Sequence, residues 1–104
     1  MSYWLHEAAE AELGEAALFY AEHASPAIAH TFLDEFERVL DVLQSNQALG
    51  TRQPGGLRTY PLRRFPYSIV FREDEDLGPQ IYAVAHQRRR PGYWTQRLQL
   101  PQGS

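Results

Sequence analysis

Cysteine and lysine are both absent from this chain of 104 residues, and no long hydrophobic run interrupts it. Without cysteine the chain can form neither a disulfide framework nor a zinc site built from thiolates. No apolar stretch approaches the roughly 20 residues that a membrane-spanning helix needs. The first seven residues also lack the basic and apolar pattern of an export signal. We therefore expect a cytoplasmic protein that uses no membrane, no metal and no cofactor.

Hydrophobic residues make up 43% of the chain and its net charge is only −3, which argues against a mainly disordered protein. A chain of this length corresponds to one domain. The sequence contains no internal repeat and no linker long enough to separate two domains. We expect a single domain over residues 1–98, followed by a flexible tail over residues 99–104.

The small net charge hides a strong separation of charges along the chain. Residues 1–50 contain nine acidic residues and one arginine, a net charge of −8. Residues 51–104 contain nine arginines and four acidic residues, a net charge of +5. Such a division predicts two faces with different partners. A genomic preference for arginine codons would explain the absence of lysine, but it would not explain this separation.

Two amphipathic helices are predicted in the acidic half of the chain. Apolar residues recur at helical spacing from residue 7 onward, and again between residues 26 and 43. Ser25 and Pro26 favour the start of the second helix, because serine caps helix N-termini and proline suits the first helical position. The connection around Ala24 is short, so the two helices should form an antiparallel hairpin.

The basic half is predicted to form strands. Residues 58–63 alternate weakly between polar and apolar side chains, and Pro61 argues for an edge or bulged strand. Residues 67–72 alternate more clearly, and residues 80–86 form a second run that is rich in strand-forming side chains. An acidic turn separates these two runs, which predicts a β-hairpin with the second run as a central strand.

The remaining segments complete the expected architecture. Residues 2–6 have the pattern of a short opening strand, and residues 46–56 have the composition of a loop. Residues 93–98 could form about one helical turn. The expected order is β-α-α-β-β-β. This is an α+β domain in which an antiparallel helical hairpin packs on a small, mostly antiparallel sheet.

The residues that could carry chemistry are mostly basic or aromatic. Arg72 ends one predicted strand and His86 ends the next, where strand alternation places it on the same face as Tyr82 and Val84. A single histidine at a strand end is nevertheless more often a hydrogen-bonded structural residue than a general base. The complete set of candidates is Arg58, Arg63, Arg64, Arg72, His86, Arg88, Arg89, Arg90 and Tyr93.

One reaction that such a set could catalyse is the cleavage of RNA by its own 2′-hydroxyl. That reaction needs a base for the hydroxyl, cations for the phosphate and an acid for the departing oxygen. His86 or Glu73, the arginines and Tyr93 could supply these groups. Arginine clusters also bind acidic proteins and nucleic acids without any catalysis, so the pattern does not distinguish between these functions.

Some of the same residues have structural interpretations. Tyr93 and Trp94 could pack the C-terminal segment onto the sheet, because aromatic side chains mostly serve burial. Arg58 could be a partly buried arginine held by a carboxylate of the helical hairpin, such as Glu15 or Glu37. The residues outside this set provide no phosphate-binding glycine loop, no nucleophile motif and no spacing typical of metal ligands.

The order of elements and several local strings resemble the RelE/ParE superfamily of type II toxin–antitoxin toxins over residues 3–98. The opening strand runs into AAEAEL at residues 8–13, and ALFY at residues 17–20 lies toward the end of the first helix. The most specific strings are RTYPLRRFPYSIVF at residues 58–71 and AVAHQRRRPGYW at residues 83–94. The resemblance implies a small bacterial toxin with the fold described above, encoded beside an antitoxin that neutralises it by direct binding.

Two activities diverge within this superfamily. RelE-like members cut messenger RNA in the ribosomal A site with basic and aromatic residues, whereas ParE-like members poison DNA gyrase. The RelE-like catalytic candidates by motif position would be Arg64, Arg72, His86, Arg88 and Tyr93. RelE-like sites commonly use lysines, which this chain lacks, and its two specific strings are similar to those of plasmid-stabilisation toxins of the ParE type. The ParE-like interpretation is therefore favoured.

Two alternatives stay open beside a ParE-like gyrase inhibitor. One is a RelE-like, ribosome-dependent endoribonuclease, and the other is a non-toxic protein that has the toxin fold and only binds an antitoxin. Whether the chain is an enzyme depends on this choice.

The resemblance also implies a ParD- or RelB-like antitoxin as partner, in a toxin–antitoxin hetero-oligomer. The target would be DNA gyrase or, in the alternative, the ribosome and its messenger RNA. Such antitoxins typically have an acidic segment that folds on the toxin. The basic half offers a complementary surface, and the grooves of the helical hairpin could take apolar anchors. The expected contact residues for antitoxin or target are Arg58, Arg63, Arg64, Arg88, Arg89, Arg90 and Tyr93.

Overall fold

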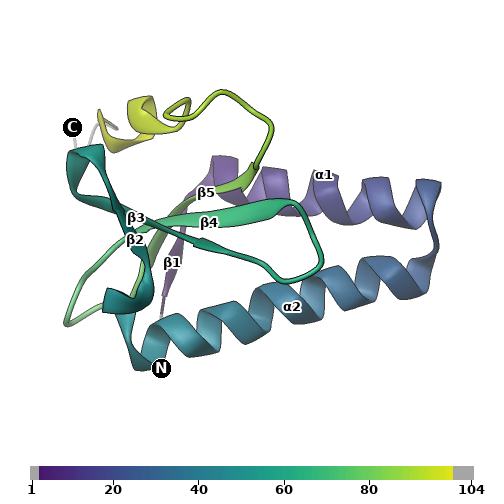
Figure 1. The fold of residues 1–104 in the computed structure, drawn as a ribbon, viewed down its shortest axis with the longest axis horizontal. Coiled ribbons are helices and arrows are strands. Elements are labelled where there is room, and N and C mark those ends of the chain that lie inside the picture. Colours follow the sequence, from purple (N-terminus) through teal and green to yellow (C-terminus); the bar gives the residue numbers. More distant parts are fainter. Residues whose placement is uncertain (1–2, 100–104) are drawn as a thin grey trace.

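The computed structural model describes residues 3–99 as two helices packed on a five-stranded sheet (Figure 1). Helix α1 (Glu7–His23) and helix α2 (Pro26–Ser45) form the predicted hairpin. Both helices pack against the same face of the sheet, and their connection extends beyond it (Figure 1). The α+β prediction is therefore confirmed.

Each helix begins at a side-chain cap. The Nδ1 atom of His6 accepts a hydrogen bond from the Ala8 N–H at 2.9 Å, at the start of α1. The Ser25 hydroxyl oxygen accepts from the Ile28 N–H at 3.1 Å, and Pro26 occupies the first position of α2, as predicted. These caps satisfy N–H groups that have no partner within their own helix.

The sheet has the strand order β1-β5-β4-β3-β2. Strand β1 (Trp4–Leu5) is parallel to β5 (Gln80–His86), and the other neighbouring strands are antiparallel. Strand β4 (Tyr67–Arg72) lies at the centre and forms the predicted hairpin with β5. The middle of β5 is buried on both faces and β5 has a neighbour on each side, although β4, not the predicted β5, is the central strand of the five.

The prediction of a loop over residues 46–56 is wrong in one respect, because strand β2 (Thr51–Gln53) lies within it. Two 3-10 turns flank this strand, η1 (Gln47–Leu49) and η2 (Pro54–Gly56). The side chains of β2 are polar and mostly exposed at the sheet edge. An exposed polar strand shows no hydrophobic alternation, so the sequence carried no signal for it.

Strand β3 (Leu57–Pro61) is not the edge strand that Pro61 suggested, because β2 lies outside it. The pairing of β3 with β2 ends at Thr59, two residues before the proline. Pro61 therefore lies beyond the part of β3 that pairs with β2. Its missing backbone N–H breaks no hydrogen bond between these two strands.

A β-bulge in β5 reverses one predicted orientation. The register between β4 and β5 passes from Ile81 directly to Ala83, so it skips Tyr82. Tyr82 packs on the face beneath the C-terminal segment, whereas Val84 packs toward the helices. The prediction that Tyr82 shares a face with Val84 and His86 is wrong, because the extra residue shifts the alternation by one.

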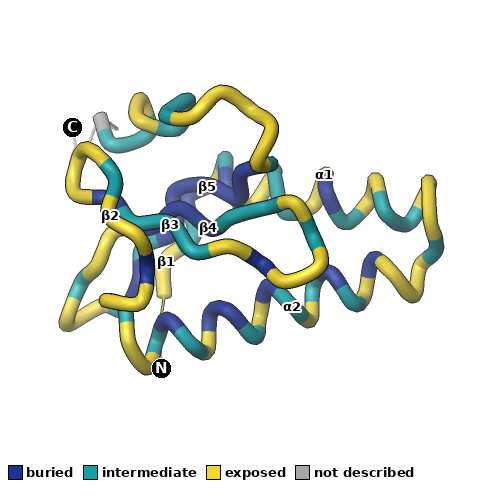
Figure 2. The backbone as a smooth tube through the Cα atoms, viewed as in Figure 1, coloured by how far each residue is buried: buried dark blue, intermediate teal, exposed yellow. Residues whose placement is uncertain are grey.

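Two hydrophobic clusters lie on opposite faces of the sheet, where the buried backbone of β4 and β5 runs (Figure 2). The larger cluster lies between sheet and helices and contains the fully buried Phe32, Phe71 and Ile81. The smaller cluster includes Val70 and lies under the C-terminal segment. The residues of that segment that pack against it are Tyr93, Trp94 and Leu98. This confirms the packing interpretation of the two aromatic residues.

The C-terminal segment crosses the sheet after β5 and ends in the 3-10 turn η3 (Thr95–Gln99), close to the single helical turn that was predicted (Figure 1). Of the tail expected over residues 99–104, Gln99 belongs to this turn. Residues 100–104 lie outside the described part of the chain.

Candidate functional site

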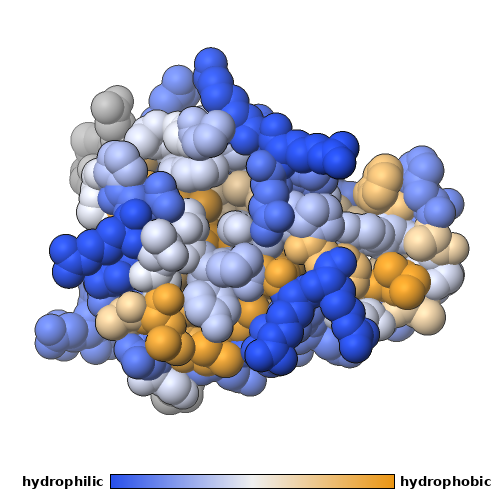
Figure 3. All heavy atoms as spheres, viewed as in Figure 1, coloured by the Kyte–Doolittle hydropathy of each residue, from blue (hydrophilic) through white to orange (hydrophobic). Residues whose placement is uncertain are grey.

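The predicted basic residues lie at two opposite ends of the sheet. The Gln87 N–H donates to the Pro66 carbonyl at 2.8 Å, so the segment after β5 lies beside the loop between β3 and β4. Figure 3 shows strongly hydrophilic side chains over both of these segments. The arginines at this end, which we call the basic end, are Arg63, Arg64, Arg88, Arg89 and Arg90. Those at the opposite end are Arg52, Arg58 and Arg72.

Arg58 is a structural residue at that opposite end. Its side chain is only 12% exposed, its Nε donates to Glu73 at 2.7 Å, and one terminal nitrogen donates to the Gly50 carbonyl at 2.7 Å. The structure confirms a partly buried arginine held by a carboxylate, but Glu15 and Glu37 were the wrong partners. The strand register explains why Glu73 is the partner: β3 pairs with β4, and Glu73 directly follows β4.

Arg72 does not join the other candidates for RNA cleavage. It donates to the Gln80 side chain at 3.2 Å, and its guanidinium lies 5.5 Å from the centre of the Tyr82 ring. His86 is at the other end of the same strand pair, where it is opposite Tyr67. The five RelE-like candidates therefore do not converge on one site, and Glu73 lies at the wrong end to serve as their base.

A cavity of about 220 Å³ brings three of the predicted residues together. One wall is formed by residues of α1, among them Glu12 and Phe19. The other wall contains His86, Arg89 and Tyr93, together with Tyr67 of β4. This is the place in the described structure where a predicted histidine, arginine and tyrosine meet.

The His86 ring is held by one hydrogen bond and one aromatic contact. Its Nδ1 atom lies 3.0 Å from the Arg88 N–H and accepts a hydrogen bond from it. Its ring also packs edge-on against Tyr67, with ring centres 5.0 Å apart. Because the Nδ1 lone pair is used in this way, a neutral ring carries its proton on Nε2. In this arrangement the Nδ1 atom is occupied by the backbone of the turn after β5 and is not free to accept from a substrate hydroxyl.

Glu12 is the central residue that the sequence analysis missed. Its carboxylate is 12% exposed and accepts hydrogen bonds from the Val84 N–H at 3.0 Å and the Tyr93 hydroxyl at 2.7 Å. Two terminal nitrogens of Arg97 each donate to it at 2.9 Å, and Arg89 lies 3.7 Å away. In the sequence it is one of several glutamates on the same helix, so only the fold distinguishes it.

This cluster shifts the ionisation of its members. Burial acts to raise the pKa of the Glu12 carboxyl, but hydrogen bonds from Arg97, Tyr93 and the Val84 N–H outweigh it and hold that pKa below its ordinary value. The hydrogen bond to Glu12 raises the pKa of Arg97. Burial and the hydrogen bond to Glu12 raise the pKa of Tyr93 well above its usual range. Tyr93 therefore stays protonated, and its hydroxyl donates a hydrogen bond to Glu12.

The loop between β3 and β4 is fastened to α2 by a second carboxylate. Glu35 accepts from the Arg63 N–H at 2.6 Å and from two nitrogens of Arg38 at 2.7 and 2.8 Å. The backbone of Arg64 is left-handed, with φ of 71°, an uncommon conformation for a residue with a side chain. The loop is thus held in one shape, with the side chains of Arg63 and Arg64 at the surface.

The described part of the chain, residues 3–99, contains no group of three or more histidine, aspartate or glutamate side chains that could hold a metal ion. Within the same residues, neither helix has the combination of length and apolar character that crossing a membrane requires.

A helical hairpin on one face of an open five-stranded sheet, with an arginine-rich segment over the other face, is the α+β arrangement that the RelE/ParE resemblance implied. The family model described as "ParE toxin of type II toxin-antitoxin system, parDE" matches residues 3–91. The chain therefore belongs to the ParE toxin family. The resemblance seen in the sequence is confirmed, and its ParE branch is the one supported.

A solved structure gives independent agreement. A chain from the "Chromosomal ParDE TA system from P. aeruginosa" superposes with a TM-score of 0.70 and is 26% identical in sequence. The match covers 83% of this chain and 95% of that chain. No curated protein matches the sequence.

Proposed function

We propose that this ParE-family toxin stops bacterial growth by poisoning DNA gyrase through a contact surface, with no catalytic residue of its own. The surface is the basic end together with Tyr93. Poisoning of this kind needs a complementary surface that traps the enzyme, whereas RNA cleavage needs a free base and a free acid near one phosphate.

The state of His86 and Tyr93 carries this proposal. The Nδ1 of His86 already accepts the Arg88 N–H, and the Tyr93 hydroxyl already donates to Glu12. Burial and that hydrogen bond raise the pKa of Tyr93, so its hydroxyl is a poor proton donor to a leaving group. The Nδ1 atom of His86 and the hydroxyl of Tyr93, which acid–base chemistry would need, are thus both engaged in hydrogen bonds within the toxin.

A cognate antitoxin would neutralise the toxin by covering the same surface. An acidic segment would pair with the basic end, and α1 offers apolar anchor points beside it, since Leu18 is 57% exposed and Phe19 51% exposed. Phe19 also lines the cavity that Arg89 and Tyr93 share. Target and antitoxin would then compete for one surface in the cytoplasm, where the toxin would be stored as a hetero-oligomer with its antitoxin.

Purified toxin added to DNA gyrase tests the proposal. We expect loss of supercoiling and accumulation of cleaved DNA, both prevented by prior addition of the antitoxin. Matched reactions with translating ribosomes should leave messenger RNA intact. Codon-positioned cuts in messenger RNA, reduced about 10²–10⁴-fold in His86→Ala, would instead establish the RelE-like endoribonuclease. A chain that binds the antitoxin but affects neither gyrase nor messenger RNA would establish the non-toxic alternative.

A further inference from the structure

Strand β1 covers only part of the outer edge of β5. Its register ends at Leu5, which pairs with Ile81, whereas β5 continues to His86. No other strand of the described residues lies on that side. An uncovered edge leaves backbone N–H and C=O groups that need partners, and it can also recruit foreign strands.

Two side chains supply these partners. The Val84 N–H donates to one oxygen of Glu12 at 3.0 Å, and the Tyr82 carbonyl accepts from a terminal nitrogen of Arg97 at 2.8 Å. Glu12 and Arg97 are joined to each other by two hydrogen bonds of 2.9 Å. Together they present an acceptor to the strand's N–H and a donor to its carbonyl, as the backbone of a neighbouring strand would.

The same pair fixes the C-terminal segment. Arg97 belongs to η3 and Glu12 to α1, so their contact joins the segment to the first helix. Tyr93 donates to the same carboxylate, and two guanidinium groups contact its ring, that of Arg89 at 3.7 Å and that of Arg97 at 5.2 Å from the ring centre. The side chains of Glu12 and Arg97 are only 12% and 17% exposed, so water weakens their interaction little.

We propose that Glu12 and Arg97 form an edge clamp, a positioning pair that stands in for the missing strand beside β5 and holds residues 87–94 in the orientation that binds the target. The step from this orientation to toxicity rests on the proposed function of the basic end. Neither residue touches the target in this proposal. They act through the segment that carries Arg88, Arg89 and Arg90.

The direction of the hydrogen bonds to β5 distinguishes the edge clamp from an ordinary ion pair. An ordinary pair would survive an exchange of its charges, as in the double variant Glu12→Arg with Arg97→Glu. In the edge clamp that exchange places a guanidinium against the Val84 N–H and a carboxylate against the Tyr82 carbonyl. Donor then faces donor and acceptor faces acceptor, so the exchange should not restore the clamp.

Amide hydrogen exchange of the whole toxin, followed by NMR, tests the clamp directly. In Glu12→Ala and in Arg97→Ala we expect the Val84 N–H to exchange at least about tenfold faster relative to the core N–H of Ile69. Glu12→Gln should lie between these variants and the unchanged chain, because its amide oxygen can still accept one hydrogen bond. Glu10→Gln is the matched control, since Glu10 is exposed on the same helix, and it should change nothing.

Growth inhibition and antitoxin affinity, measured on the same variants, complete the test. We expect growth inhibition and antitoxin affinity to fall most in the variants whose Val84 N–H exchanges fastest. Neither should recover in the charge-exchanged double variant. Unchanged exchange at Val84 in Arg97→Ala, or full recovery in the double variant, would overturn the clamp. Faster exchange at Val84 with unchanged toxicity and antitoxin affinity would overturn the positioning role, because residues 87–94 would then not depend on the pair for their orientation. Whether the unchanged toxin poisons gyrase is the separate test of the proposed function. Should Glu12→Ala fail to fold, Arg97→Ala carries the same comparison, because it leaves α1 unaltered.

Discussion

The guanidinium of Arg89 stacks on the ring of Tyr93, 3.7 Å from the ring centre, while one of its nitrogens lies 3.7 Å from Glu12. The three consecutive arginines after β5 are therefore not equivalent. Arg89 is partly committed to the fold, although its side chain is 58% exposed. Arg88 and Arg90 are also exposed and have no ion pair with a described carboxylate. These two are the cleaner probes of what the basic end binds.

Charge reversal at Arg88 should weaken function without weakening the fold. In Arg88→Glu we expect slower association with an acidic antitoxin, a flatter salt dependence of that rate and reduced growth inhibition, because a favourable long-range attraction has become repulsive. The melting temperature should hardly move, since exposed charge changes usually alter stability by less than about 0.5 kcal/mol. Stopped-flow association at low and high salt measures the first two effects.

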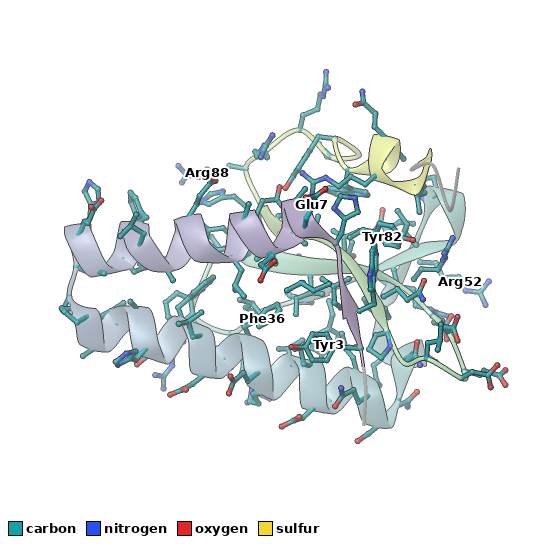
Figure 4. The ribbon with its side chains drawn as sticks, turned by 180° about the vertical axis from the view of Figure 1, so that it is seen from behind. Tyr3, Glu7, Phe36, Arg52, Tyr82 and Arg88 are labelled. Atoms are coloured by element: carbon teal, nitrogen blue, oxygen red, sulfur yellow. The ribbon has the colours of Figure 1, made fainter. Side chains whose placement is uncertain are left out.

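Arg52→Glu is the control for that experiment. It makes the same change in net charge at an exposed arginine of β2, and Figure 4 shows Arg52 far from Arg88, toward the opposite end of the sheet. If both variants slow association equally, the net charge of the toxin matters and the position of the arginines does not. That result would remove the basic end as a specific contact surface.

The cap of the first helix should make stability depend on pH near neutrality. Burial lowers the pKa of His6 below its ordinary value, and the charge of Arg97 acts in the same direction, with smaller opposing effects of Glu7 and Glu12. The unfolded chain therefore binds a proton at His6 more readily than the folded chain does. This contribution to stability is fully present above the unfolded pKa of about 6.5 and is lost as pH falls toward the lower folded pKa.

Urea unfolding at several pH values between about 7.5 and 5.5 measures this dependence. His6→Asn should flatten it, because asparagine also caps helices but does not titrate. His30→Asn makes the same substitution at an exposed histidine of α2 and is the matched control. A slope that persists unchanged in His6→Asn would show that another group is responsible.

Two glycines should respond oppositely to the same substitution. Gly14→Ala should stabilise the toxin by about 0.5–1 kcal/mol, because Gly14 lies within α1 and a new Cβ meets nothing within 4 Å. Gly50→Ala should destabilise it by about 1–3 kcal/mol, because the new Cβ would lie 2.8 Å from two ring carbons of the buried Phe71 and 2.9 Å from Arg58. Thermal unfolding of both variants checks the opposite signs.

Removing the carboxylate beneath the loop between β3 and β4 should loosen that loop. Glu35→Ala leaves the Arg63 N–H without its acceptor at 2.6 Å and frees Arg38, so we expect a loss of about 1–2 kcal/mol in the free energy of unfolding. Glu37→Ala, an exposed change two residues away on α2, should cost less than about 0.5 kcal/mol. Equal losses in the two variants would mean that the contact with Arg63 contributes nothing.

Local pattern was sufficient for the helices and the longer strands. Helical spacing of apolar residues, with Ser25 and Pro26 at the second start, predicted α1 and α2. Alternation predicted β4, and a nearly continuous run of strand-forming residues predicted β5. These signals are visible in the sequence because they follow from periodic burial of one face. The three polar residues of β2 bury no face, and therefore they gave no such signal.

The site depended on contacts that link distant parts of the chain. The sequence itself determined the excess of arginine in the second half and the aromatic residues that cover the sheet. Tertiary structure alone decided that Arg58 pairs with Glu73, that a bulge turns Tyr82 away from Val84, and that Arg97 and Tyr93 share one carboxylate. That carboxylate, Glu12, is 85 residues from Arg97 along the chain. Residues so far apart come into contact only when the helix packs on the sheet. Local periodicity cannot indicate which of the several glutamates of α1 this packing will bury.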